Sequence, residues 1–152
     1  YYSLAANQNY PRAQFNLGFY YLTTKHENKN IDRGLKLLFQ SSLGGIVEAN
    51  FTLGCLYHEG KYLKQDIIKS INYYKEASSF NNQYAKNNLG IIYKLGFNKI
   101  IHQNIDMAMI YFNEAIQQKN DEISIYNLSH TYIFEDKTSE GIDKSIELLI
   151  KA

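Results

Sequence analysis

Histidine is the residue type in this chain best suited to metal binding or acid–base chemistry, and the chain contains four histidines. A zinc site on a helix needs two histidines on one face, about four residues apart. His58 is followed by Glu59 but by no second histidine at that spacing. The histidines also lie at unrelated positions of the repeat described below, so they should point to different faces: His26, His58, His102 and His130. We therefore expect no metal site and no cofactor.

Catalytic nucleophiles and phosphate-binding loops are not indicated either. Gly44-Gly45 lies where a helix should end, and the Lys-Ser or Lys-Thr pair of a phosphate-binding loop does not follow it. The serine pairs at 41–42 and 78–79 occupy small-residue positions that suit packing. Carboxylates are scattered, without a pair that the repeat would bring together. The sequence therefore predicts a protein without catalytic activity.

The single cysteine, Cys55, excludes a disulfide within the chain. Its apolar helical surroundings favour packing over reactivity. Small secreted scaffolds tend to carry several cysteines, so the sequence favours a reducing intracellular compartment without identifying one.

The composition is that of a globular protein able to bury a sizeable core. The chain has 152 residues, of which 45% are apolar, and this length favours one domain. Sixteen basic and fifteen acidic residues leave a formal net charge of +1, whereas nucleic-acid binding usually requires a basic excess. No apolar run approaches the roughly 20 residues that cross a bilayer. We expect neither a nucleic-acid partner nor a membrane span.

Two short patterns recur along the chain at a nearly constant interval. The first pairs bulky apolar residues with small ones: YYSLAA at 1–6, LLFQSS at 37–42, YYKEAS at 73–78, YFNEAI at 111–116 and LLIKA at 148–152. The second lies between these: AQFNLGFYY from 13, ANFTLGCLY from 49, AKNNLGIIY from 85 and SIYNLSHTY from 124. The first pattern returns after 36, 36, 38 and 37 residues. A period of this length with two patterns per repeat predicts a solenoid of two-element repeats.

Both elements should be helices. Ala13, Leu17 and Tyr21 follow each other at intervals of four, which places them on one helix face, and the next two copies keep that spacing. Asn9, Gly45 and Asn81 come after the second element, where a left-handed residue commonly ends a helix. The sequence predicts helices near 1–7, 11–24, 31–43, 47–59, 66–79, 83–95, 104–118, 121–134 and 141–152.

Three glycines at one position of the repeat require an explanation. Gly18, Gly54 and Gly90 each lie inside an expected helix, where glycine costs about 0.5–1 kcal/mol relative to alanine. Ser129 holds this position in the fourth copy. Because all three repeats accept this cost in helix stability at the same position, we expect the partner helix to approach closely there.

The joined pattern, A-x3-L-G-x2-Y followed by paired aromatics and small residues, resembles the Sel-one-like repeat, a relative of the tetratricopeptide repeat. Gly60 and Gly96 match the family's glycine after the first helix, whereas Thr24 and Glu135 replace it in the first and fourth repeats. The resemblance implies an all-α, right-handed α-solenoid of antiparallel helix pairs. We expect one solenoid segment over 1–152, a fragment of a longer array, with repeats at about 1–10 (a half repeat), 11–46, 47–82, 83–120 and 121–152.

The resemblance also implies a binding surface. In tetratricopeptide arrays the first helices line a concave side, and the residue before the Leu-Gly pair often offers a side-chain amide to an extended ligand. Amides beside aromatic rings would form a plausible groove, in which rings contribute buried area and amides set the register. Alternatively, the same amides cap contacts between repeats and the rings pack there. The candidate partner-binding residues are Phe15, Asn16, Phe19, Phe51, Thr52, Asn87, Asn88, Ile91, Tyr126, Asn127 and His130.

These observations favour a non-catalytic scaffold or adaptor that binds a peptide or a partner subunit along the first helices. An alternative is a structural subunit embedded permanently in a large multiprotein assembly. The repeat length would also allow helical-repeat RNA binding, but the balanced charge and the Leu-Gly pattern argue against it.

Overall fold

The structure is a computed structural model that describes residues 6, 10–24, 30–117, 122–136 and 138–151. These residues form helices joined by loops, with one isolated β-bridge between Phe97 and Ile101. The helices are α2 (Pro11–Thr23), α3 (Ile31–Leu43), α4 (Val47–Glu59), α5 (Ile67–Ser79), α6 (Gln83–Leu95), α7 (Ile105–Ile116), α8 (Glu122–Thr131), the π-helical turn η1 (Tyr132–Asp136) and α9 (Ser139–Lys151).

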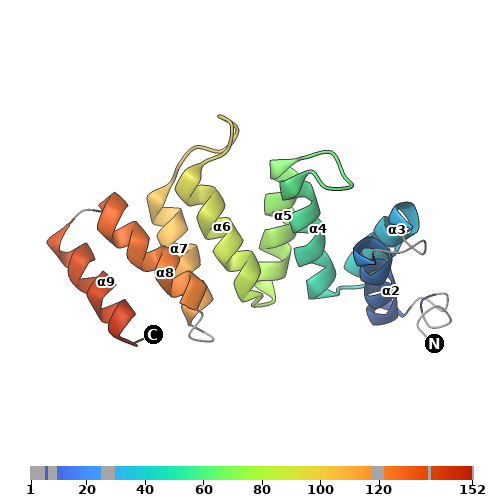
Figure 1. The fold of residues 1–152 in the computed structure, drawn as a ribbon, viewed down its shortest axis with the longest axis horizontal. Helices are drawn as coiled ribbons and strands as arrows, with labels where there is room; N and C mark the ends of the chain where they lie inside the picture. The colour runs from blue at the N-terminus through green and yellow to red at the C-terminus, as the bar shows by residue number, and fades with distance from the viewer. Residues whose placement is uncertain (1–5, 7–9, 25–29, 118–121, 137, 152) are drawn as a thin grey trace. The chain divides into compact units, whose positions relative to one another are not determined.

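The helices form antiparallel pairs within two compact units, Tyr1–Phe80 and Asn81–Ala152. In the first unit α2 packs against α3 and α4 against α5, and α3 also contacts α4 (Figure 1). In the second unit α6 packs against α7, and α8 contacts both α7 and α9. The all-helical fold that the sequence predicts is therefore confirmed. The helix expected at 1–7 and its end at Asn9 lie outside the described residues, apart from the buried, helical Ala6.

The first helices turn the same face toward the core in both units. The leucine before the small residue is almost fully buried in each of them, at 7% exposure or less: Leu17, Leu53, Leu89 and Leu128. This follows from the spacing of four between apolar positions, which aligns them along one side of a helix.

The glycine position is also occupied as expected, although the partner differs between repeats. A Cβ atom on Gly18 would lie 2.9 Å from the backbone oxygen of Gly34, so here the backbone of the partner helix approaches closely. At Gly54 and Gly90 the space is taken by an aromatic ring of the partner helix instead. A Cβ atom there would lie 2.6 Å from the ring of Tyr74 and 2.5 Å from that of Phe112.

Helix ends follow the local residue chemistry. Gly45 and Asn81 adopt positive φ angles of 80° and 64° after the second helices, as predicted. The first helices α4 and α6 end at Gly60 and Gly96, with φ angles of 71° and 69°. The second helices begin at side-chain caps, for example at Asp66, whose carboxylate accepts a hydrogen bond from the backbone N–H of Lys69.

The fourth repeat departs from the expected continuous helix over 121–134. The α-helix stops at Thr131 and continues as the π-helical turn η1. The position that holds Gly60 and Gly96 in the preceding repeats is Glu135 here. The first repeat also lacks this glycine, yet α2 ends at the extended Thr24 without such a turn, so the missing glycine alone does not produce η1. The hydroxyl of Thr138 then accepts a hydrogen bond from the N–H of Gly141 at the start of α9.

Replacing Gly54 should destabilise the first unit through the ring of Tyr74. We expect Gly54→Ala to lower the free energy of unfolding by about 1–3 kcal/mol, because the new methyl group overpacks the crossing, and Gly54→Leu to prevent folding. Chemical denaturation of Gly54→Ala, Tyr74→Leu and the double variant forms the test. The loss in free energy of unfolding should be smaller for the double variant than the sum of the two single losses, by about 0.5 kcal/mol or more. Strict additivity would show that the two residues do not share this space.

Two serines at equivalent positions of the second helices should respond in opposite directions to alanine. The Ser70 hydroxyl donates a hydrogen bond of 2.9 Å to the Gly54 carbonyl oxygen, whereas the buried Ser145 hydroxyl has no partner among the described residues. We expect Ser70→Ala to cost about 1 kcal/mol and Ser145→Ala to stabilise the protein by up to about 1 kcal/mol. Thermal unfolding measures both, and the helix propensity of alanine contributes equally to each. Equal shifts in melting temperature would contradict this assignment.

Candidate peptide-binding face

Within each unit, the face formed by its two first helices is here called the first-helix face of that unit: α2 with α4 in the first and α6 with α8 in the second. In the first unit it contains a hollow of about 600 Å³ between α2 and α4. A volume of this size is typical of sites that bind small molecules or single side chains. The lining residues are Phe19, Leu22, Thr23, Thr24, Thr52, Cys55, Leu56, Glu59, Lys61 and Tyr62.

The aromatic candidates of the first unit divide between the hollow and the core. Phe19 lines the hollow and is 44% exposed, and Thr52 lines it from the neighbouring helix. Phe15 is partly buried against the core cluster and lies 5.9 Å, between ring centroids, from Phe19. Phe51 is partly buried 5.9 Å from the ring of Tyr74. Of the three aromatic candidates, Phe19 thus lines the hollow, and Phe15 and Phe51 are partly buried against neighbouring residues.

The predicted row of polar side chains is not uniform. Asn16 and Asn88 are half-buried, and their side chains have no hydrogen-bond partner among the residues that the structure describes. Thr52 instead donates its hydroxyl to the Glu48 carbonyl oxygen, 2.7 Å away. Asn127 donates to the side-chain oxygen of Asn87 at 2.9 Å. Asn127 thus makes the contact between repeats that the alternative interpretation expects.

In the second unit, the candidates lie at different depths. Asn87 is 8% exposed, and its oxygen also lies 3.4 Å from the Ser124 hydroxyl, so its side chain belongs to the interface between α6 and α8. Ile91 is half-buried against the core, whereas Tyr126 is 62% exposed. His130 is half-buried, and its Nδ1 atom lies 2.9 Å from the Nζ atom of Lys94.

Sequence reasoning missed three residues of this face: Tyr62, Lys94 and Phe134. Tyr62 has a positive φ of 66° and donates its hydroxyl to the Leu22 carbonyl oxygen at 3.3 Å, across the rim of the hollow. Phe134 lies on η1, 4.4 Å from the ring of His130. Lys94 occupies the repeat position that holds the buried Leu22 in the first repeat. Aligning the repeats would therefore have shown a charged residue at a position that is apolar in the first repeat.

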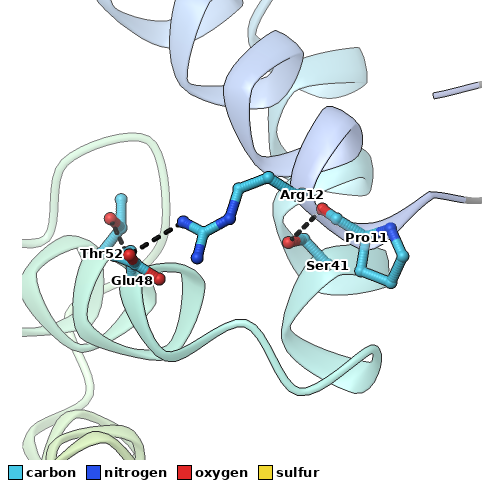
Figure 2. A network of polar contacts seen from close by, with 5 residues as sticks. All are labelled: Pro11, Arg12, Ser41, Glu48 and Thr52. Carbon is cyan, nitrogen blue, oxygen red and sulfur yellow. Dashed lines mark hydrogen bonds and ion pairs between the residues drawn. The ribbon is translucent and has the colours of Figure 1, made fainter. Parts of the chain in front are cut away.

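A polar network joins the start of α2 to its neighbours (Figure 2). The Arg12 guanidinium lies 2.8 Å from the Glu48 carboxylate of the next first helix, and the Ser41 hydroxyl donates to the Pro11 carbonyl oxygen at 2.7 Å. The hydrogen bond from Arg12 holds the pKa of Glu48 below its ordinary value. Both charged side chains are about half exposed, so the pair is worth little in stability. Its effect is to link two successive first helices beside the hollow.

Burial changes the protonation chemistry of two residues on this face. It raises the pKa of the Cys55 thiol, a shift that the Glu59 carboxylate reinforces and a hydrogen bond from the Tyr74 hydroxyl opposes. Burial lowers the pKa of the Lys94 ammonium, which the Glu135 carboxylate counteracts. Desolvation disfavours the charged form in both cases.

The described residues contain no group of three or more His, Cys, Asp or Glu side chains close enough to hold a metal ion. His26 lies outside them. Within the same described ranges, no helix is both long and apolar enough to cross a membrane.

Comparison with known proteins assigns the family. The Sel1 repeat matches residues 11–45, 47–79 and 83–120, which is more than half of the chain, and the chain therefore belongs to the Sel1 repeat family. Sel1 repeats are generally non-catalytic helical modules that mediate protein interactions. None of the curated proteins compared with the sequence gave a significant match.

Two solved structures share the fold. The protein c5321, a protective antigen of uropathogenic Escherichia coli strains with an SLR fold, is 24% identical over 86% of this chain, with a TM-score of 0.78. A Sel1 repeat protein from Oxalobacter formigenes is 19% identical over 95% of this chain, with a TM-score of 0.82. The chain spans 27% and 58% of the lengths of these two proteins. At these identities the similarity concerns the fold.

The thiol of Cys55 should react slowly at neutral pH. Because the thiolate is the nucleophile and burial raises the pKa of this thiol, alkylation by iodoacetamide should be several-fold slower than that of glutathione. The rate should continue to rise at pH values above those at which glutathione has reached its plateau. The urea-unfolded chain is the control and should react like glutathione. A native rate equal to that of glutathione would contradict the partial burial of Cys55.

Proposed function

We propose that this protein is an interaction scaffold whose first-helix face binds an extended peptide segment of a protein partner. The observation that carries the proposal is the hollow between α2 and α4. Its lining combines apolar side chains such as Phe19 and Leu56 with charged residues, Glu59 and Lys61, in one cavity. This combination is typical of sites in which apolar contacts contribute affinity and a few polar groups fix orientation.

The backbone strain at Tyr62 supports a functional role for the hollow. A tyrosine with a positive φ is disfavoured by about 1–2 kcal/mol, so the surrounding contacts must hold it there. Its ring packs on the core cluster and its hydroxyl donates to the Leu22 carbonyl oxygen. This residue therefore closes one side of the hollow and fixes the end of α2 relative to the loop after α4.

One free amide in each unit, Asn16 in the first and Asn88 in the second, supports binding of an extended main chain to that unit. Each amide offers two N–H donors and one oxygen acceptor. A peptide backbone presents N–H and carbonyl groups in alternation, so such amides can bind it without reading its sequence. In contrast, the Thr52 hydroxyl and the Asn127 amide already donate hydrogen bonds within the protein.

Peptides selected from a random phage-displayed dodecapeptide library should bind the wild-type chain and respond to a change in the hollow. We expect Thr52→Trp, which places a large ring in the hollow, to weaken binding of the principal selected peptide about tenfold or more. Asn16→Ala should weaken it less. Fluorescence anisotropy with labelled peptides measures both affinities.

The matched control for Thr52→Trp is Ile68→Trp, at an exposed position of α5 away from the hollow. Circular dichroism melting curves identify variants that fail to fold. The proposal would be rejected if no peptide were enriched on the folded wild-type protein. It would also be rejected if the selected peptides bound the tryptophan and alanine variants as tightly as the wild type.

A permanent subunit of a large assembly is the second candidate, and one surface favours it. Helix α9 exposes several large apolar side chains: Ile142, Ile146, Leu149 and Ile150. Such a face is costly to leave in water. Size-exclusion chromatography of the isolated protein separates the two functions, because a scaffold with transient partners should elute as a soluble monomer and an obligate subunit should aggregate.

A further inference from the structure

In the second unit, the first-helix face carries a cation that no carboxylate of the described residues contacts directly. The Lys94 ammonium lies 2.9 Å from Nδ1 of His130, across the contact between α6 and α8. No carboxylate lies within 4.0 Å of this ammonium among the residues that the structure describes. One imidazole nitrogen can accept only one of the three ammonium protons. Lys94 therefore keeps donor capacity that the described part of the protein does not use.

Lys86 shows how a comparable lysine is satisfied in the same unit. Its ammonium lies near the Asn81 side-chain oxygen and the Glu114 backbone oxygen, at 3.3 and 3.5 Å, and 3.9 Å from the Glu114 carboxylate. Among the described residues, the Lys94 ammonium has no comparable set of oxygen acceptors. The Lys94 side chain is partly buried, and this burial lowers its pKa. A partly desolvated ammonium gains more from an incoming anion than an exposed one does.

Two aromatic rings flank His130, the residue that contacts this cation. The His130 ring lies 6.0 Å from the ring of Tyr126 and 4.4 Å from that of Phe134, measured between centroids. Tyr126 and Phe134 are 62% and 55% exposed, so most of their area is open to a partner. Phe134 lies on η1, the π-helical turn that follows α8. Among the described repeats, only this one ends its first helix in such a turn. Turns of this kind frequently occur at functional sites.

We propose that the α6–α8 face binds an acidic peptide, with an Asp or Glu carboxylate accepting the remaining ammonium protons of Lys94 beside His130 and a neighbouring apolar side chain on Phe134 and Tyr126. This deepens the proposed function and rests on its premise that the first-helix face binds peptides. One ammonium and one imidazole match a single carboxylate. A nucleic-acid backbone would need several cations along one path, and the chain as a whole carries a formal net charge of only +1. The exposed Glu135 carboxylate is the internal competitor, since it already interacts electrostatically with Lys94.

The test selects dodecapeptides on the Thr52→Trp variant, whose hollow in the first unit is blocked. The selected peptides should carry Asp or Glu beside an apolar residue and should bind more weakly as the salt concentration rises. Lys94→Met should weaken them about tenfold, Lys94→Arg should retain most of the affinity, and Glu135→Gln should tighten binding. Repeating the selection on Lys94→Glu should enrich Lys or Arg instead.

The matched control is Lys75→Glu, which makes the same charge change as Lys94→Glu but at an exposed position of α5. It should leave the affinity for the selected acidic peptides within about twofold of the Lys94-containing parent. Three results would overturn the acidic-peptide site: no enrichment on the Thr52→Trp variant, selected peptides without acidic residues, or peptides insensitive to Lys94→Met. Displacement of the peptides by polyuridylic acid would also overturn it, because that would identify a phosphate site. If the wild-type protein still enriched peptides sensitive to the hollow, the proposed function would stand without this inference.

Discussion

The fold depends on one steric constraint, which is that the two helices of each repeat cross where both carry small residues. At the first crossing, a Cβ atom on either glycine would lie within 3.1 Å of the other's backbone oxygen. At the second, the serine hydroxyl donates to the glycine carbonyl oxygen. A larger residue at these points would separate the helices, and the leucines beside them would lose their burial. These two pairs are Gly18 with Gly34 and Gly54 with Ser70. The small residues at the corresponding repeat positions are Gly90 and Ala108 in the third repeat and Ser129 and Ser145 in the fourth.

The same constraint shapes the candidate site. Because Gly54 lacks a side chain, the ring of Tyr74 lies directly against α4, and its hydroxyl donates to the sulfur of Cys55, 3.4 Å away, in the lining of the hollow. In the third repeat, Phe112 fills the corresponding space but has no hydroxyl. The packing requirement inside these helix pairs therefore also determines which ring lies under the first-helix face.

Periodic features could be predicted from the sequence because each recurs with the same physical cause. The helices from α2 to α7 begin and end within two residues of the expected positions, and Gly45 and Asn81 have the left-handed conformation. The hollow and the Lys94–His130 contact could not be predicted, because they depend on distances between helices that no short pattern encodes. The end of the fourth first helix was mispredicted for a related reason. Glu135 indicates that the usual stop is absent, but not that a π-helical turn replaces it.

Specificity in such a chain must come from the positions that packing leaves free to vary. The residue six positions after the first alanine or serine of each first helix is an example, since phenylalanine, cysteine, isoleucine and histidine occupy it in turn. Three positions further on, the buried Leu22 of the first repeat corresponds to Lys94 in the third. One fold therefore presents a hollow of mixed polarity in one unit and a cation beside a histidine in the other. Because these positions lie outside the helix crossings, we expect that changing one such side chain alters recognition without altering the helix pair.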